Sequence, residues 1–206
     1  MKKITIISML ILVLVISSTK NQVFADFSDV GDRYTESVNH LVSNNYAQGF
    51  TDTKFGTTTP IKRIDAAVMV ARVMGFTESG SYPNAGFTDV SKERQWAVNA
   101  LANADVISGK ATGRYGANDL MTRSEMAKVI ASAYDLQASS QTVPFTDVSD
   151  RFLPYVAALV ENEVGVGKTT TSFGATAPVT RGEFSLFVLR GDRLLEVVPP
   201  EVISVD

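Results

Sequence analysis

One pattern of residues occurs three times along this chain, with the same internal spacing each time. It begins with Phe-x-Asp-Val, found at Phe27–Val30, Phe87–Val90 and Phe145–Val148. An aromatic-Gly pair begins 28 residues after each first Phe, at Phe55-Gly56, Tyr115-Gly116 and Phe173-Gly174. Self-similarity at a fixed period indicates one supersecondary unit used repeatedly. Three equivalent units suggest three equivalent surfaces, which a single catalytic centre would not need.

Three further positions keep their spacing in every copy. A glycine lies 22 residues after each first Phe, at Gly49, Gly109 and Gly167. An arginine lies eight residues after each aromatic residue of the aromatic-Gly pair, at Arg63, Arg123 and Arg181. An acidic residue follows two residues later, at Asp65, Glu125 and Glu183.

The first 25 residues differ from the repeats and have the pattern of a secretory signal peptide. Lys2 and Lys3 precede an apolar run over residues 4–16, and Ala25 supplies the small residue of a cleavage site. A membrane anchor is the alternative, but the run is shorter than the roughly 20 residues that a spanning helix needs. We therefore predict a signal peptide over residues 1–25, secretion, and no membrane span after cleavage.

Composition limits the chemistry of the mature chain. Without cysteine it has no disulfide, thiol nucleophile or zinc–thiolate site, so its core must come from packing. Cleavage would remove three lysines and no acids, which takes the basic residues from 19 to 16 against 22 acidic ones. Nucleic acid is not an expected partner, because phosphate binding needs a basic face. No metal or cofactor is expected either, since no cluster of ligating residues stands out.

Each repeat is predicted to contain two helices joined by a glycine-bearing loop. The first helix has apolar residues at i, i+3 and i+4, which places them on one face. These residues are Val38, Leu41 and Val42, then Val98, Leu101 and Ala102, then Val156, Leu159 and Val160. Ser91 is a candidate cap in copy two, and Pro154 suits a first helical turn in copy three. The helix should end before the loop glycine.

The second helix has a clear start signal in two copies. Thr122–Glu125 and Thr180–Glu183 are both Thr-x-x-Glu, the pattern of a capping box, in which each side chain bonds a backbone amide of the other residue. Copy one has Lys62-Arg63-Ile64-Asp65 instead, so we expect no hydroxyl cap there. Apolar faces follow in all three copies, formed by Ile64, Ala67, Val68 and Ala71, by Met126, Val129, Ile130 and Ala133, and by Phe184, Phe187 and Val188.

Together, these motifs resemble tandem S-layer homology (SLH) domains over residues 26–194. The resemblance implies an all-α fold, in which three helix-loop-helix repeats form a pseudo-three-fold assembly around a central helical bundle. The implied repeats cover residues 26–83, 84–143 and 144–194, and residues 195–206 form a tail or linker. A monomer with an internal pseudo-trimer is expected. A single repeat should not fold alone, because about 58 residues without disulfide or metal offer little core.

The resemblance also implies a function, namely non-covalent attachment to the secondary cell-wall polysaccharide of a Gram-positive-type bacterium. The implied ligand is a sugar with a pyruvate ketal, which carries one carboxylate. The protein would then be a secreted, non-enzymatic component of the cell wall or surface layer. It would bind the pyruvylated polysaccharide in grooves between repeats.

The motif arginines are the first candidates for ligand contact. A guanidinium binds a carboxylate through two parallel bonds, and a nearby helix N-terminus also favours anions. The alternative is that each arginine pairs with an acid of the neighbouring repeat. We expect Arg123→Ala and Arg181→Ala to weaken wall binding with folding nearly intact. Arg63→Ala should matter least, because copy one has lost the surrounding motif.

Other candidates are less specific. Trp96 matches a sugar-contacting Trp of the family but could equally belong to the core. The loops after Gly49, Gly109 and Gly167 could bond the saccharide. The Asp of Phe-x-Asp-Val is predicted to be a turn or cap residue. His40 has no counterpart in the other copies and is predicted to be superficial or partly packed.

Two other classes of protein stay open. A secreted glycoside hydrolase would need two carboxylates in different environments, whereas the acids here recur where capping explains them. A self-assembling surface-layer protein would normally carry an additional assembly domain. Binding to washed cell walls separates the three, because an anchor sediments without degrading them, a hydrolase releases soluble sugar, and an assembler forms sheets without walls.

Overall fold

The computed structural model describes residues 27–196, and this part of the chain is helical and contains no strand, which confirms the all-α prediction. Its helices are α1 (Asp32–Ser43), α2 (Arg63–Val73), the 3₁₀ helix η1 (Lys92–Arg94), α3 (Gln95–Asn103), α4 (Arg123–Ala133), α5 (Leu153–Glu161) and α6 (Arg181–Glu196). Each repeat contributes two α-helices, as expected. The predicted signal peptide and the tail beyond residue 196 lie outside the described residues. Within residues 27–196, no helix has the length and apolar character needed to cross a membrane.

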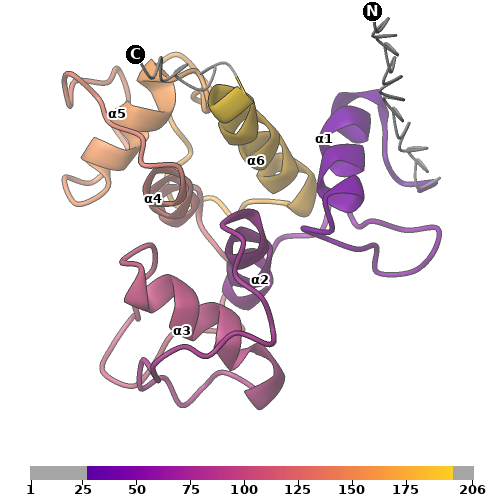
Figure 1. Ribbon diagram of the computed structural model, residues 1–206. Helices are drawn as coiled ribbons and strands as arrows, with labels where there is room; N and C mark the ends of the chain where they lie inside the picture. Colours follow the sequence, from indigo (N-terminus) through magenta and orange to yellow (C-terminus); the bar gives the residue numbers. More distant parts are fainter. Residues whose placement is uncertain (1–26, 197–206) are drawn as a thin grey trace, which may run out of the picture.

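The helices pair between repeats rather than within them. The main pairs are α2 with α3, α4 with α5, and α1 with α6. Figure 1 shows the second helices α2, α4 and α6 around the middle of the molecule, each with one first helix outside it. The first helix of every repeat therefore packs on the second helix of the preceding repeat, and the first repeat packs on the third. The order of these contacts is cyclic.

A ring of backbone hydrogen bonds joins the three inner helices just before they begin. The amide of Ile61 donates to the carbonyl of Val179 (2.8 Å), Val179 donates to Met121 (2.9 Å), and Met121 donates to Ile61 (3.0 Å). All three side chains are buried. In addition, α4 contacts both α2 and α6. Contact between the second helices is thus present, while the exact rotational relation of the repeats stays a prediction.

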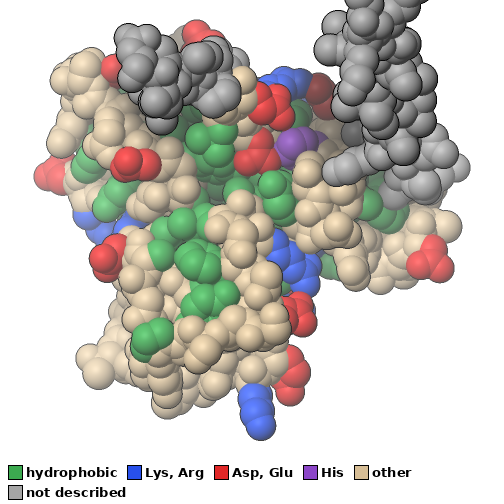
Figure 2. All heavy atoms as spheres, viewed as in Figure 1, with side chains coloured by type: hydrophobic (Ala, Val, Ile, Leu, Met, Phe, Trp, Pro, Cys, Tyr) green, Lys and Arg blue, Asp and Glu red, His purple; other side chains and the backbone are tan. Residues whose placement is uncertain are grey.

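The predicted apolar faces supply the core. On the predicted apolar face of each first helix, the first Val and the Leu are at most 1% exposed. The third residue of each face, Val42, Ala102 or Val160, is only partly buried. In the second helices the buried set includes Ile64, Met126, Ile130, Phe184 and Val188. On the face drawn in Figure 2, hydrophobic side chains lie near the middle of the molecule, with charged ones both between them and at the outline.

The helix starts agree with the capping predictions. Thr122 and Glu125 form a complete capping box at α4. The same reciprocal bonds join Thr180 and Glu183 at α6, at 3.0 and 3.2 Å. At α2 the N-cap is Lys62, which makes no side-chain cap bond. Ser91 caps η1 by position but not through its side chain, and Pro154 lies in the first turn of α5.

Candidate binding grooves

The Asp of each Phe-x-Asp-Val supports the loop that carries the aromatic-Gly pair. The carboxylate of Asp147 accepts hydrogen bonds from the amides of Phe173 (2.8 Å), Gly174 (2.8 Å) and Ala175 (2.9 Å). Asp29 and Asp89 bind the equivalent amides at 2.7 to 3.1 Å. The expected structural role is therefore present, but it fixes a loop 26 residues away rather than a local turn or helix cap.

These hydrogen bonds favour the charged form of the aspartates. Burial opposes ionisation of Asp147, but the amides of Ala175 and Phe173, together with Ser172, lower its pKa to about 2. In Asp29 and Asp89 the effect of burial is likewise outweighed by backbone amides, so the pKa of each lies below the ordinary value.

The recurrent glycines are explained by packing. A Cβ on Gly49, Gly109 or Gly167 would lie only 2.4 to 2.5 Å from the ring of the Phe that begins the same repeat. Only glycine leaves room for that ring. Gly116, in the aromatic-Gly pair, has φ of +81°, a backbone conformation that glycine adopts without strain. The predicted ligand role of the three loop glycines thus has a packing role beside it, and Gly109 and Gly167 also line two of the cavities described below.

Each motif arginine is buried against the next repeat, with 5% of the residue exposed. The Nε of Arg123 donates to the carbonyl of Phe173 (2.8 Å), and its Nη2 donates to the carbonyl of Val166 (2.9 Å). Arg63 makes the same two contacts with Tyr115 and Ser108, at 3.2 and 3.1 Å. Arg181 makes them with Phe55 and Gln48 of the first repeat, at 3.0 and 2.8 Å.

The aromatic residue of the next repeat lies against each guanidinium. The Cζ atoms of Arg63, Arg123 and Arg181 are 4.6, 4.7 and 4.5 Å from the ring centroids of Tyr115, Phe173 and Phe55. Such cation–π contacts are more favourable in a desolvated site. The arginine of each copy and the aromatic residue of the next copy therefore form a contact between successive repeats.

The remaining nitrogen of the arginine faces the motif acid. Nη1 of Arg63 lies 3.3 Å from Glu125, and Nη1 of Arg123 lies 4.0 Å from Glu183. Each pair joins two repeats, as the alternative expected from the sequence requires. Burial lowers the pKa of Arg123, and the Glu183 carboxylate opposes that effect. Because Nε and Nη2 already donate to carbonyls, a ligand carboxylate cannot make the two-bond contact through this pair of nitrogens without displacing them.

The helix N-termini are also occupied. The amides of Arg123 and Ser124, the first two residues of α4, donate to the carbonyls of Ala177 and Ala175 at 3.0 Å. Arg63, Ile64, Arg181 and Gly182 make the equivalent bonds at 2.9 to 3.1 Å. These amides therefore donate to backbone carbonyls rather than to an anion, and assistance from the helix start in ligand binding stays a prediction.

Three cavities lie outside the contacts that join the repeats at the starts of the second helices. Each cavity is lined by residues of all three repeats. We name them by their motif arginine. Each is lined by that arginine, by the next repeat's glycine loop and second helix, and by a basic residue at the start of the following first helix. The Arg63 groove, about 340 Å³, is lined by Arg63, Ile107, Ser108, Gly109, Lys110, Thr122, Glu125, Lys128, Val129, Arg151 and Phe152.

The other two grooves are built in the same way. The Arg123 groove, about 330 Å³, is lined by Arg33, Arg123, Val166, Gly167, Lys168, Glu183, Leu186, Phe187 and Arg190. The Arg181 groove, about 230 Å³, is lined by Tyr46, Ala47, Gln48, Asp65, Val68, Met69, Arg72, Arg94 and Arg181. In all three, several cations surround one carboxylate.

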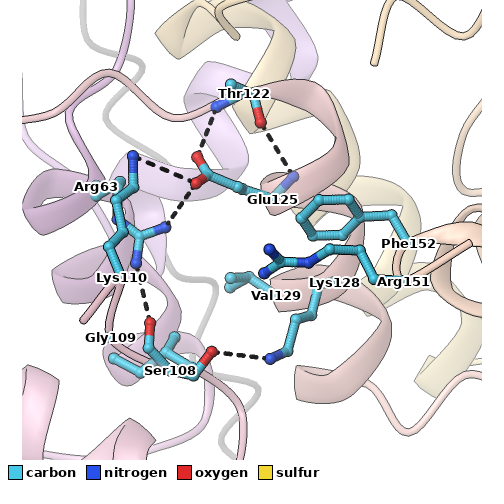
Figure 3. Close-up of a pocket in the computed structure, with 11 residues that line it drawn as sticks. Arg63, Ser108, Gly109, Lys110, Thr122, Glu125, Lys128, Val129, Arg151 and Phe152 are labelled. Atoms are coloured by element: carbon cyan, nitrogen blue, oxygen red, sulfur yellow. Dashed lines mark hydrogen bonds and ion pairs between the residues drawn. The ribbon is translucent and has the colours of Figure 1, made fainter. Parts of the chain in front are cut away.

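Most of these cations were not anticipated from the sequence. In the Arg63 groove, Lys110, Lys128 and Arg151 line the same cavity as the motif arginine. Figure 3 shows Arg63 and Lys110 beside Glu125, and Lys128 bonded to Ser108. A signal was available, because Arg33 and Arg151 lie six residues after the first Phe of their repeats, and Lys110 and Lys168 lie 23 residues after it. Side-by-side comparison of the copies would have found both pairs.

The two single-copy candidates lie elsewhere. Trp96 is partly buried against the core and does not line any of the three grooves. His40 is partly packed, and its Nε2 lies 2.6 Å from Asp192 of α6. Across residues 27–196, no group of three or more His, Cys, Asp or Glu side chains could hold a metal ion.

These features define a class of protein, namely a helical module of three interlocked repeats with basic grooves between them. A family model for the S-layer homology domain matches the chain three times, at residues 23–67, 86–127 and 144–185. The chain belongs to the S-layer homology domain family. The three matches confirm the recognition of three tandem repeats.

Individual relatives share this region and are much longer. The chain is 33% identical over 99 residues to a surface-layer 125 kDa protein of Lysinibacillus sphaericus, a match that covers 47% of the chain and 8% of that protein. It is 26% identical over 123 residues to an endoglucanase of Bacillus sp. (strain KSM-635), covering 58% and 13%. It is 25% identical over 174 residues to the exoglucanase XynX of Acetivibrio thermocellus, covering 79% and 16%. The chain thus spans less than a fifth of each of these relatives.

Family membership and the surface-layer relative support a module for anchoring at the bacterial cell surface. The relatives named as an endoglucanase and an exoglucanase match over only 13% and 16% of their own lengths. Their similarity to this chain is therefore similarity to a small part of each enzyme.

Proposed function

We propose that this protein is a secreted, non-enzymatic module that holds itself to the cell wall by binding an anionic wall polysaccharide in its grooves. One observation carries the proposal. The Arg63 and Arg123 grooves each place four cations around one carboxylate, in a chain whose formal net charge is −3. An overall acidic protein that gathers positive charge in concave sites is suited to a ligand with localised negative charge.

A pyruvate ketal on the polysaccharide would supply that charge as one carboxylate per modified sugar. The grooves also offer what the rest of a sugar requires. In the Arg63 groove the Ser108 hydroxyl and the Phe152 ring lie beside the cations. Hydroxyl groups can bond sugar hydroxyls, and an aromatic ring can cover the apolar face of a sugar.

Co-sedimentation with purified sacculi tests this function. We expect the protein to sediment with sacculi that retain their polysaccharide and to release no soluble sugar from them. Mild acid removal of the ketal should abolish most of the binding. Equal binding before and after ketal removal would contradict carboxylate recognition, and release of reducing sugar would favour a hydrolase.

A further inference from the structure

The three grooves differ in whether their cations already have carboxylate partners. In the Arg181 groove, Arg94 pairs with Asp65, and Arg72 pairs with Glu78 at 2.9 Å. Asp65 belongs to the first repeat and Arg94 to the second, so this ion pair spans the groove. Asp65 also takes the sequence position of Glu125 and Glu183. The cavity is the smallest of the three, about 230 Å³ against 340 and 330 Å³.

The Arg181 groove also lacks a lysine that the other two have. Lys110 and Lys168 lie against the glycines of their aromatic-Gly pairs, and at the equivalent position Phe50 lies against Gly56. The ring centroid of Phe50 is 4.4 Å from Cζ of Arg181. Phe50 therefore replaces a cation and covers one side of the motif guanidinium.

In the Arg63 groove two cations have no carboxylate partner among the described residues. Neither Arg151 nor Lys128 forms an ion pair within 4.0 Å with any described residue. Lys128 donates to the hydroxyl of Ser108 at 3.0 Å, and its Nζ lies 6.0 Å from the ring centroid of Tyr155. Figure 3 shows Arg151 and Lys128 extending into the gap across from Arg63. Burial lowers the pKa of Lys128, and the charges of Arg151 and Arg63 lower it further, which reflects an excess of positive charge.

The Arg123 groove has the same excess. Arg33 makes no ion pair with any described residue, and its Cζ lies 5.4 Å from the ring centroid of Tyr34. Arg190 donates to the carbonyl of Val164 at 3.3 Å, and it too has no acidic partner within residues 27–196. A ligand carboxylate could pair with these side chains without breaking an existing ion pair.

We propose that the ligand's carboxylate binds in the Arg63 and Arg123 grooves, and that the Arg181 groove is closed to it. Arg151 with Lys128, and Arg33 with Arg190, are the side chains that contact the anion. In the Arg181 groove an incoming carboxylate would have to displace Asp65 from Arg94 and pass Phe50. This inference rests on the proposed function and adds the number of sites and the residues that create them.

Equilibrium dialysis with a radiolabelled methyl hexoside carrying a 4,6-pyruvate ketal would count the sites on the full chain. We expect two sites at saturation, and none for the same glycoside without the ketal. Three equivalent sites would overturn the inference while leaving the proposed function in place. No uptake of the ketal probe would overturn the proposed function, and the inference with it.

Paired variants assign the sites. Arg151→Gln with Lys128→Gln should lower affinity at one site by about 10- to 100-fold, the range for loss of charge-assisted hydrogen bonds. Arg33→Gln with Arg190→Gln should do the same at the other site. Arg94→Gln is the matched control, since it removes a groove cation of the same kind and should leave both sites unchanged. Loss of a site in Arg94→Gln would contradict the proposal.

A gain of binding offers the complementary test. Phe50→Lys with Asp65→Asn restores the lysine and frees Arg94, so the double variant should bind a third equivalent of the probe. A count that stays at two would show that these residues do not close the groove. Thermal melting of every variant checks that the fold is retained.

Discussion

The junction where the inner helices begin and the rims of the grooves outside it differ in how strictly the three copies agree. At the junction, all three copies make the same backbone hydrogen bonds, although copy one has Lys62-Arg63-Ile64 in place of Thr-Arg-x. At the rim, one position is lysine in two copies and Phe50 in the other. Backbone donors and acceptors are present at almost every residue, so contacts made through them survive sequence change. Rim chemistry depends on side chains and is lost with a single substitution.

The largest expected effect on folding comes from isolating one repeat, which removes all of its contacts with the other two. Residues 84–143 alone contain α3 and α4, whose main partners α2 and α5 belong to the other repeats. This fragment should therefore show weak helicity and no cooperative unfolding. Circular dichroism melting, with the full chain as the reference, checks the prediction. A sharp transition in the fragment would mean that the repeats are independent domains.

The next largest effect should follow loss of a motif arginine. Arg63→Ala, Arg123→Ala and Arg181→Ala each leave two carbonyls of the next repeat without their donors. We expect each to lower the free energy of unfolding by about 2–4 kcal/mol. This replaces the sequence-based expectation that folding stays nearly intact and that Arg63 matters least.

Urea unfolding of the three variants measures this cost. Arg114→Ala is the matched control, because Arg114 is exposed and pairs only with Asp119, at 2.8 Å. Exposed pairs of this kind contribute about 0–1 kcal/mol. If the motif variants were as stable as Arg114→Ala, the arginines would not be structural links between repeats, and direct ligand contact would be the better explanation of the motif.

A smaller effect is expected from the aspartates that support the loops. The folded-state pKa of Asp147 is lowered to about 2, so its contribution to stability is present above the unfolded pKa near 3.8 and is lost as the pH falls through about 2. Asp147→Asn should cost about 1–2 kcal/mol at neutral pH, reduced from the full shift because solvent screens an exposed carboxylate. Unfolding measured from pH 5 to 2 should show the difference between variant and wild type shrinking. A constant difference would contradict the ionic origin.

The smallest expected effect is at a helix cap. Thr122→Ala removes one half of the capping box at α4 and should cost about 1 kcal/mol. Lys62 is the N-cap of α2 and makes no cap bond, so Lys62→Ala should be nearly neutral. Thermal melting of both variants compares the loss of a side-chain cap bond, in Thr122→Ala, with a substitution that removes no cap bond, in Lys62→Ala. Equal losses would argue that the cap contributes nothing specific.

The helices and their apolar faces could be predicted from the sequence, because periodicity and capping are local properties. Thr122 and Glu125, for example, reveal their role within four residues. Which helices pack against each other could not be predicted from the sequence. The face of α1 fits the same kind of apolar surface on any second helix, and only the three-dimensional arrangement places it on α6 rather than on its own repeat's α2.

The candidate site was predicted in part. From the sequence, the motif arginines were expected first to contact the ligand, with pairing to an acid of the neighbouring repeat as the alternative. That Nε and Nη2 of Arg123 bind carbonyls could not be predicted, because the identity of a residue does not show where its backbone carbonyl lies. Nor could the sequence bring Arg151 to the Arg63 groove, since the two lie in different repeats. The loop glycines were recognised as recurrent, yet their close contact with Phe27, Phe87 and Phe145 depends on folded geometry.

The packing of α1 against α6 has a consequence for how the chain reaches its native state. Among the described helices α1 is made first and its partner α6 last, so the apolar side of α1 lacks that partner while the intervening 137 residues from Asn44 to Thr180 are made. Contacts that span most of a chain slow folding, because the entropy of closing a long loop is lost before the contact forms. Assembly should therefore end with a late step in which the two ends of the repeat array meet, and slowing that step would expose α1 and α6 to aggregation.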